Sequence, residues 1–193
     1  RKNEFLKQWN NDWKLEFIEA VDSRGDLWHQ FAYENKISID ATQELLDAIK
    51  NKKRKYHESL TEGAVGCYLS HVKCWEACLN NKDGDYCLVL EDDSTTSKDF
   101  FSKINEVVNK VKIKWGIINL GWASTTPYQI LNNNLAIVDR FFLAHAYLLS
   151  NHGAETLLKL HNKIEKQVDA FMSDHSKEII ILGLRKTLWF QRS

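Results

Sequence analysis

Three consecutive carboxylates, Glu91, Asp92 and Asp93, follow directly on the apolar run at residues 86–90, Tyr-Cys-Leu-Val-Leu. A continuous apolar run of this length predicts a strand buried on both faces of a largely parallel sheet. In open α/β sheets, ligands bind at the carboxyl ends of the strands. Carboxylates there suit Mg²⁺ or Mn²⁺, which prefer oxygen ligands and often bind substrate phosphates as well. The alternative is an acidic turn that starts a helix and is stabilised by the helix dipole.

A second group of chemically active side chains combines His71 with the four cysteines, Cys67, Cys74, Cys78 and Cys87. Positions 67, 71, 74 and 78 share one face of a predicted helix, which suggests a metal site. They extend over about 16 Å, whereas zinc holds all its ligands at roughly 2.0–2.3 Å. We therefore interpret the cysteines as reduced side chains on a core-facing stripe, which favours a reducing compartment. Ser70 and His71 are adjacent on this helix and do not face each other, so they predict no hydrolase dyad.

Hydrophobic periodicity predicts the elements that position these residues. Apolar positions at helical spacing predict helices at residues 3–12, 40–49, 64–81, 98–110 and 153–162. Thr61 is the expected N-cap of the third helix. Apolar runs predict strands at residues 15–18, 86–90 and 115–121 and a third apolar segment at residues 141–149. In the tail, residues 179–183 and 188–191 could form a closing strand and an acceptor-side loop. This alternation predicts a single α/β domain over residues 1–193, with a mixed, mostly parallel sheet flanked by helices.

Charge and hydropathy exclude some classes of function. The 26 basic and 26 acidic residues give a net charge of zero, so the whole molecule is not steered toward nucleic acid or anionic lipid. We interpret the basic run at residues 50–55 as a solvated helix end rather than a nucleic-acid patch. Apolar stretches of about eight residues are far short of the roughly 20 that span a bilayer, although peripheral membrane contact stays open. With no signal peptide visible, we expect a cytoplasmic protein.

Four blocks of sequence carry a resemblance. Residues 62–71 read Glu-Gly-Ala-Val-Gly-Cys-Tyr-Leu-Ser-His, and residues 88–93 read Leu-Val-Leu-Glu-Asp-Asp. Residues 146–154 hold Ala-Tyr-Leu-Leu-Ser and a later Gly-Ala pair, and residues 168–172 read Val-Asp-Ala-Phe-Met. In this order the blocks resemble the signature motifs of glycosyltransferase family 25, which includes lipooligosaccharide and collagen galactosyltransferases.

The resemblance implies a GT-A-like, Rossmann-like fold and a metal-dependent hexosyltransferase. It implies a nucleotide-sugar donor, usually a UDP-hexose such as UDP-galactose, and a hydroxyl acceptor on a glycan or protein. Mn²⁺ or Mg²⁺ would bridge the diphosphate and act as a Lewis acid. We assign Asp93 and Glu91 to the metal, and Asp92 to the metal or the ribose. His145 or His175 could add a ligand, with a surface or hydrogen-bonded histidine as the alternative for each.

Members of this family are thought to invert the anomeric carbon, which requires a general base on the acceptor hydroxyl. Asp169 is the candidate base, and a helix N-cap is its alternative reading. Ser70 and His71 lie in the block assigned to donor binding. His71 is either structural or a hydrogen-bond donor near the phosphates. Trp122, just past a predicted strand, is a candidate for stacking on the base or sugar.

The chain also departs from the family pattern. The family's opening hydrophobic strand is not seen ahead of Arg1, Gly116 stands where the family has an acidic residue, and prolines are missing near Glu62 and Gln167. Two functions therefore stay open. One is an active hexosyltransferase, and the other is a degenerate or fragmentary member that acts as a non-catalytic binding module. The intact acidic triplet favours the enzyme, because an unused carboxylate cluster is destabilised by self-repulsion.

Overall fold

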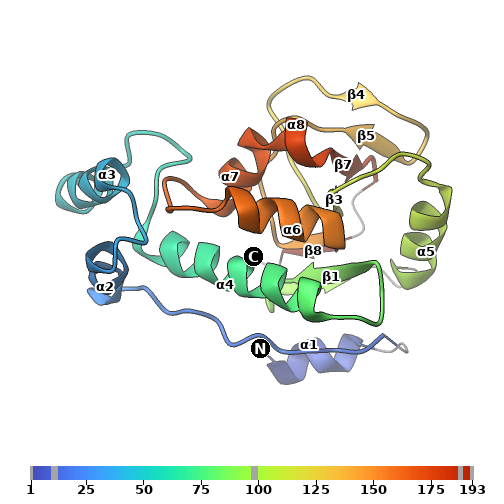
Figure 1. Cartoon of the computed structure of the whole chain (residues 1–193), viewed down its shortest axis with the longest axis horizontal. Coiled ribbons are helices and arrows are strands. Elements are labelled where there is room, and N and C mark those ends of the chain that lie inside the picture. Colours follow the sequence, from blue (N-terminus) through green and yellow to red (C-terminus); the bar gives the residue numbers. More distant parts are fainter. Residues whose placement is uncertain (1, 10–12, 97–99, 187–188, 192–193) are drawn as a thin grey trace.

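The computed structural model describes residues 2–9, 13–96, 100–186 and 189–191. They form an α/β fold in which helices pack on a mixed six-stranded sheet (Figure 1). Its strand order is β1-β6-β3-β7-β5-β4. The bounds are β1 Tyr86–Leu90, β3 Ile117–Asn119, β4 Gln129–Ile130, β5 Leu135–Ile137, β6 Ala146–Ser150 and β7 Ile181–Leu184. A separate two-stranded sheet pairs β2 (Ser94–Thr96) with β8 (Trp189–Gln191).

Strand direction in the large sheet differs from the sequence prediction. The α/β class and the mixed sheet are confirmed, but a mostly parallel sheet is wrong. Among the described strands of this sheet only β3 and β7 pair in parallel. The reason is β6, which lies antiparallel between β1 and β3, and an apolar run carries no information about the direction of its neighbours. β1 is also half-buried apart from Val89, because it forms one edge of the sheet.

The helices largely follow the predicted periodicity. They are α1 (Lys2–Gln8), α2 (Leu27–Tyr33), α3 (Ile39–Asn51), α4 (Glu62–Asn80), α5 (Phe100–Lys110), α6 (Asn151–Leu160), α7 (Val168–Asp174) and α8 (Ser176–Ile179). Parts of two predicted helices, residues 10–12 and 98–99, lie outside the described residues. Thr61 is the N-cap of α4, as predicted, and its side chain accepts a hydrogen bond from Ala64 N. The predicted strand at residues 15–18 is wrong, because this segment forms no strand.

β6 is buried on both faces and joins two hydrophobic clusters. Tyr147 and Leu149 face one cluster, which includes side chains of α4, α6 and α7. Ala146 and Leu148 face the other, which includes side chains of α1 and α5. This division follows from the strand geometry, because successive side chains point to opposite faces of a sheet. Both helical layers are therefore anchored on this one strand.

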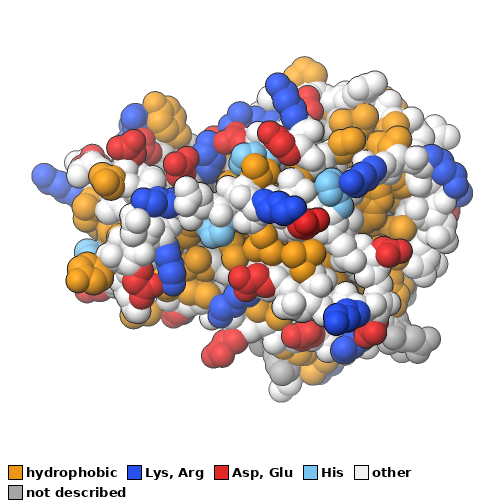
Figure 2. Space-filling model, in the orientation of Figure 1, with side chains coloured by type: hydrophobic (Ala, Val, Ile, Leu, Met, Phe, Trp, Pro, Cys, Tyr) orange, Lys and Arg blue, Asp and Glu red, His pale blue; other side chains and the backbone are white. Residues whose placement is uncertain are grey.

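The surface carries charges of both signs. Figure 2 shows basic and acidic side chains interspersed over the viewed face. The basic run at residues 50–55 begins at the end of α3, where Lys52 is the C-cap in a left-handed conformation. Lys55 lies 3.4 Å from the Glu44 carboxylate, so part of this run is paired within the protein, in line with a solvated helix end. Within the described residues, no helix has both the length and the apolar character needed to cross a bilayer.

Candidate functional site

The ends of several strands meet on one side of the large sheet, where β1 and β3 end and β6 begins. We call this side the acidic edge, which is distinct from the edge strand β1. β1 and β6 are antiparallel, with Leu90 opposite Ala146, so the residues after β1 lie beside those before β6. β3 is antiparallel to β6 as well, with Asn119 opposite Tyr147, which brings the segment after β3 to the same edge. The acidic triplet at residues 91–93, His145 and Trp122 therefore come from chain segments that converge there.

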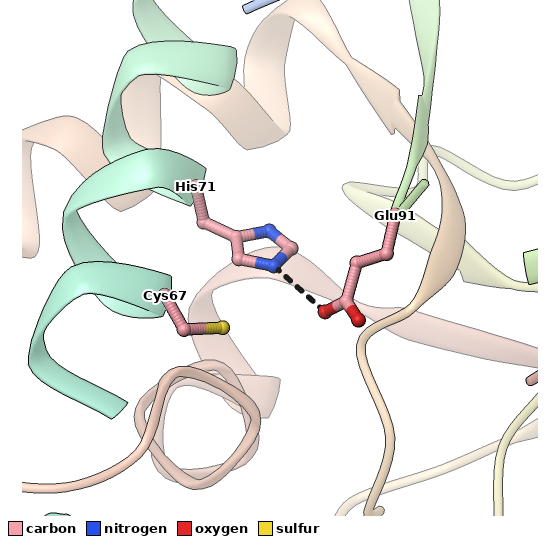
Figure 3. A group of neighbouring side chains, drawn as sticks. All are labelled: Cys67, His71 and Glu91. Atoms are coloured by element: carbon pink, nitrogen blue, oxygen red, sulfur yellow. Dashed lines mark ion pairs between the residues drawn. The ribbon is translucent and has the colours of Figure 1, made fainter. Parts of the chain in front are cut away.

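Glu91 is held at this edge by both its backbone and its side chain. Its N–H donates to the His145 carbonyl at 2.9 Å, and its Oε1 lies 3.5 Å from Nε2 of His71 on α4 (Figure 3). Burial raises the pKa of Glu91, but the hydrogen bond from His71 and the charges of His71 and His145 outweigh burial, so the pKa lies below its ordinary value. Glu91 is therefore a carboxylate at neutral pH, and it faces α4.

The two aspartates follow Glu91 in a tight turn. Asp92 is exposed and Asp93 is half-buried. The N–H of Ser94 donates to the Glu91 carbonyl at 3.2 Å, which closes the turn. The alternative reading of the triplet as a helix start is wrong, because Ser94 begins β2. The Oδ1 atom of Asp93 and the Nδ1 atom of His145 are both shielded from solvent. Each of these two residues therefore has a buried polar atom near the strand ends.

A buried hydrogen-bond network orients His71. Its Nδ1 lies 2.8 Å from the hydroxyl of Tyr147, and the indole N–H of Trp75 donates to the same hydroxyl at 3.0 Å. Burial raises the pKa of Tyr147 well above its ordinary value, so the phenol keeps its proton. Indole nitrogen only donates, so the Tyr147 oxygen accepts from Trp75. The network fixes the imidazole with Nε2 toward Glu91, which supports the structural reading of His71.

Tyr147→Phe tests this network. Removing the hydroxyl leaves the buried Trp75 indole N–H and the His71 Nδ1 without their partner, and each unsatisfied buried polar group costs about 1–3 kcal/mol. We expect the free energy of unfolding, measured by urea denaturation, to fall by about 2 kcal/mol. Tyr128→Phe is the matched control, because Tyr128 is half exposed at 50%. Equal stability of the two variants would contradict a role for the network.

Ser70 holds a neighbouring segment against α4. Its hydroxyl donates to the Gly66 carbonyl at 2.7 Å and accepts from Val21 N at 2.9 Å. At Gly66, an added Cβ would lie 2.2 Å from the Val21 carbonyl oxygen. The N–H of Gly66 donates to the hydroxyl of Ser23 at 2.6 Å. The glycine and serine of this block thus let residues 21–23 lie directly on the helix, and the donor contact of Ser70 stays a prediction.

Asp169 lies in the first turn of α7, whose N-cap is Gln167, so the reading of Asp169 as the N-cap is wrong. Its Oδ2 accepts from Leu143 N at 3.1 Å, and its Oδ1 accepts from Ala170 N at 2.8 Å. Leu143 has a φ of 76°, in the left-handed region that few non-glycine residues adopt. Asp169 therefore stabilises the turn that precedes β6 and carries His145.

Asn119, which the sequence analysis missed, holds the other side of the same turn. It is buried at 1% exposure, and its Nδ2 donates to the Leu143 carbonyl at 3.0 Å. Its Oδ1 accepts from Gly121 N at 3.1 Å. A single amide side chain thus connects the segment after β3 to the turn before β6. The sequence signal for Asn119 was its place as a polar residue inside an apolar strand. A buried polar side chain is costly unless it is hydrogen-bonded, so it is expected to have a specific partner.

Trp122 is half-buried at the end of β3. Its indole N–H donates to the Leu184 carbonyl at 2.8 Å. The ring lies on Gly183, where an added Cβ would come within 2.4 Å of the indole. Tyr128 contacts the ring edge to face at 5.2 Å. This packing fixes the indole near the converging strand ends, and stacking on a ligand stays a prediction.

His175 lies at the junction of α7 and α8. Its ring contacts Phe171 at a centroid distance of 4.8 Å, and its Nδ1 lies 3.9 Å from the Glu178 carboxylate. These contacts favour the alternative reading of His175 as a structural side chain. His145, in contrast, is buried at 3% exposure, and its carbonyl accepts the hydrogen bond from Glu91.

Cys67 brings a thiol to the same edge. All four thiols are free, but Cys67 is exposed and only Cys78 is buried, so the predicted core-facing stripe is wrong at Cys67. Its sulfur, a nitrogen of His71 and an oxygen of Glu91 lie within 4.8 Å of one another (Figure 3). Although the residue as a whole is exposed, the surrounding protein desolvates its sulfur and raises the pKa of the thiol to about 12, and the negative charges of Glu91, Asp169 and Asp93 add to the effect. Carboxylates from the acidic triplet and from Asp169 on α7 therefore both raise the pKa of this thiol.

Two surface hollows lie away from this edge. One of about 280 Å³ is lined by α5 residues and residues 132–135. The other, of about 820 Å³, is lined by α3 residues and residues 53–55. Neither is lined by a residue of the acidic triplet or by Asp169, so the candidate site is defined by convergent side chains rather than by these hollows.

The sequence is similar to a family model and to curated proteins of one family. A family model described as Glycosyltransferase family 25 (LPS biosynthesis protein) matches residues 1–138. Mouse procollagen galactosyltransferase 2 is 29% identical over 107 residues, which cover 51% of this chain and 17% of that protein. Human inactive glycosyltransferase 25 family member 3 is 30% identical over 157 residues, 76% of this chain and 25% of that protein. Bovine probable inactive glycosyltransferase 25 family member 3 is 30% identical over 107 residues, 52% of this chain and 18% of that protein. The chain thus spans about a quarter or less of the length of these relatives.

Proposed function

Because this chain belongs to glycosyltransferase family 25, we propose that it is a metal-dependent hexosyltransferase. It moves galactose from UDP-galactose to a hydroxyl of a glycan or protein acceptor, with inversion. The observation that carries the proposal is the acidic triplet at residues 91–93, which follows the carboxyl end of β1 beside His145. The name of the mouse relative, procollagen galactosyltransferase 2, supports galactose as the sugar.

The residues at this edge fit a hard divalent cation. Asp92 and Asp93 offer carboxylate oxygens, which Mn²⁺ and Mg²⁺ prefer. One oxygen of Asp93 and Nδ1 of His145 are shielded from solvent, where a charged ligand interacts more strongly than in water. We assign Asp93 as the first ligand, with Asp92 on the metal or the ribose and His145 as a further ligand. When bound, the cation supplies Lewis-acid stabilisation of the diphosphate leaving group.

Glu91 has a different part in this proposal. Its side chain lies beside His71, and its N–H is bound to the His145 carbonyl. Glu91 therefore sets the direction in which the backbone leaves β1 and presents the two aspartates. Its negative charge also contributes to the cation's environment.

Asp169 is the proposed general base on the acceptor hydroxyl. Its Oδ2 accepts from Leu143 N in the turn that carries His145, and the His145 carbonyl accepts from Glu91 N, which supports its nearness to the acidic triplet. Each of its oxygens accepts one backbone N–H, and a carboxylate oxygen has a further lone pair for an incoming hydroxyl. Anchoring by Leu143 and Ala170 would hold the base in one orientation.

Calorimetric titration of UDP-galactose and UDP-glucose, with and without Mn²⁺, tests the proposed function. We expect binding that requires Mn²⁺ and is tighter for UDP-galactose, because the cation joins the diphosphate to the aspartates. GDP-mannose is the control for the base and sugar. Absence of UDP-sugar binding at every Mn²⁺ concentration would overturn the proposal for this chain.

A non-catalytic binding module is the second candidate function. It is favoured by one observation, namely that the human and bovine relatives carry the word inactive in their names. The two functions differ in turnover. If UDP-galactose binds with Mn²⁺ but UDP is never released in the presence of glycan or collagen-type peptide acceptors, the binding module is the better description.

A further inference from the structure

We propose that Cys67, His71 and Glu91 form a binding site for Zn²⁺. Cys67 and His71 lie one turn apart on α4, and Glu91 faces them from the end of β1 (Figure 3). The site would take a borderline transition metal through sulfur, nitrogen and oxygen. This mixed ligand set distinguishes the zinc site from the oxygen-only site assigned to Asp92 and Asp93. The zinc proposal does not depend on the proposed transfer activity.

The distances are close to those of a zinc centre. Zinc bonds of roughly 2.0–2.3 Å in tetrahedral directions separate neighbouring ligand atoms by about 3.3–3.8 Å. Nε2 of His71 and Oε1 of Glu91 already lie 3.5 Å apart. The three ligand atoms all lie within 4.8 Å of one another, so the Cys67 sulfur is close to the other two atoms of the set. Solvent access at Cys67 provides an entry path and a water as the fourth ligand.

The surroundings of His71 resemble those of a metal-binding histidine. Such a histidine commonly uses its second ring nitrogen for a hydrogen bond that orients the ring. Nδ1 of His71 lies 2.8 Å from the Tyr147 hydroxyl, and Tyr147 is fully buried. With zinc on Nε2, the ring proton resides on Nδ1, which lies within hydrogen-bond distance of the Tyr147 hydroxyl.

The local charge also favours a cation. An oxygen of Glu91 lies within 4.8 Å of the Cys67 sulfur, and Glu91 is the first of three consecutive carboxylates. A dication at the thiol would be attracted by the same carboxylates. Thiolate and imidazole ligands select zinc over Mg²⁺ or Mn²⁺, which favour oxygen. Four positions along one helix could not converge on a metal, but two of them and a strand-end carboxylate can.

The test is a titration of the metal-free chain with Co²⁺ as a spectroscopic probe, without any sugar nucleotide. Metal binding releases the Cys67 thiol proton to solvent. We therefore expect one equivalent of Co²⁺ to give a thiolate-to-cobalt charge-transfer band, which Zn²⁺ then removes by displacement. Cys67→Ser should abolish the band and weaken Zn²⁺ binding by at least about 100-fold, since even outer partners of a metal ligand contribute 10–100-fold. Because Cys67 is exposed, this variant should fold, as circular dichroism can verify.

Two further variants sharpen the test. Cys74→Ser is the matched control, because Cys74 is another free thiol of α4 outside the three-residue group, and it should keep the band and the affinity. Glu91→Gln should weaken Zn²⁺ binding. A charge-transfer band that is missing in the unmodified chain, or that survives in Cys67→Ser, would overturn the proposal. Since no sugar nucleotide is present, neither result bears on the proposed transfer function.

Discussion

Asp93→Ala is expected to abolish Mn²⁺-dependent binding of UDP-galactose and to lower kcat/KM for hexose transfer by about 100–1000-fold. The reason is that Asp93 is the first ligand assigned to the cation, and removal of one group that stabilises transition-state charge typically costs this factor. Binding is measured by calorimetry and turnover by UDP release. The prediction rests on the proposed transferase function.

Asp83→Ala is the control for Asp93→Ala. Asp83 lies in the exposed turn before β1, where its carboxylate is 3.9 Å from Lys14. Surface ion pairs of this kind contribute about 0–1 kcal/mol, so we expect donor binding and turnover to stay unchanged. If Asp93→Ala still binds the donor with full Mn²⁺ dependence, the assignment of the cation to Asp93 is wrong. Thermal melting of both variants shows whether a loss reflects unfolding.

Gly153→Ala is expected to lower the free energy of unfolding by about 3 kcal/mol, the upper end of the usual cost of overpacking. Gly153 lies in α6, and an added Cβ would come within 2.4 Å of the Gly116 carbonyl oxygen and 2.8 Å of its Cα. These are backbone atoms next to β3, so no side-chain rotation relieves the contact. Urea denaturation with linear extrapolation measures the change.

Gly63→Ala is the matched control for Gly153→Ala, because it places the same methyl group in another helix. Gly63 lies in the first turn of α4, and an added Cβ there meets nothing within 4 Å. Alanine is the better helix former, so we expect stabilisation by about 0.5–1 kcal/mol. Changes of the same sign in both variants would contradict the packing of α6 on the backbone at Gly116.

The same packing explains one departure from the family pattern. An added Cβ at Gly116 would lie 2.3 Å from the Ile179 carbonyl oxygen. A carboxylate side chain at this position is therefore incompatible with the way α6 and the segment before β7 approach β3. Gly116 lies just before β3 begins, whereas the acidic triplet lies near the end at which β3 stops, so the missing acidic residue does not by itself remove a group from the acidic edge.

The sequence alone determined the local elements and the chemistry at the end of one strand. The apolar run at residues 86–90 and its acidic end predicted β1 with the triplet behind it, and Thr61 predicted the start of α4. These features are local, because apolar periodicity and helix caps depend on residues within a few positions of one another. Hence β1 was found at its predicted bounds and α4 with small differences, whereas β6, at Ala146–Ser150, covers only the second half of the apolar segment at residues 141–149.

Only the tertiary structure decided which side chains meet. The sequence placed Cys67 and His71 on one helical face, but their third neighbour, Glu91, comes from a strand. The Leu143 turn is held by Asn119 from β3 and Asp169 from α7, which no local pattern connects. The direction of β6, which brings these segments to one edge, was also mispredicted. Periodicity reports which face of an element is apolar, whereas the partner of that face depends on the packing of the whole chain.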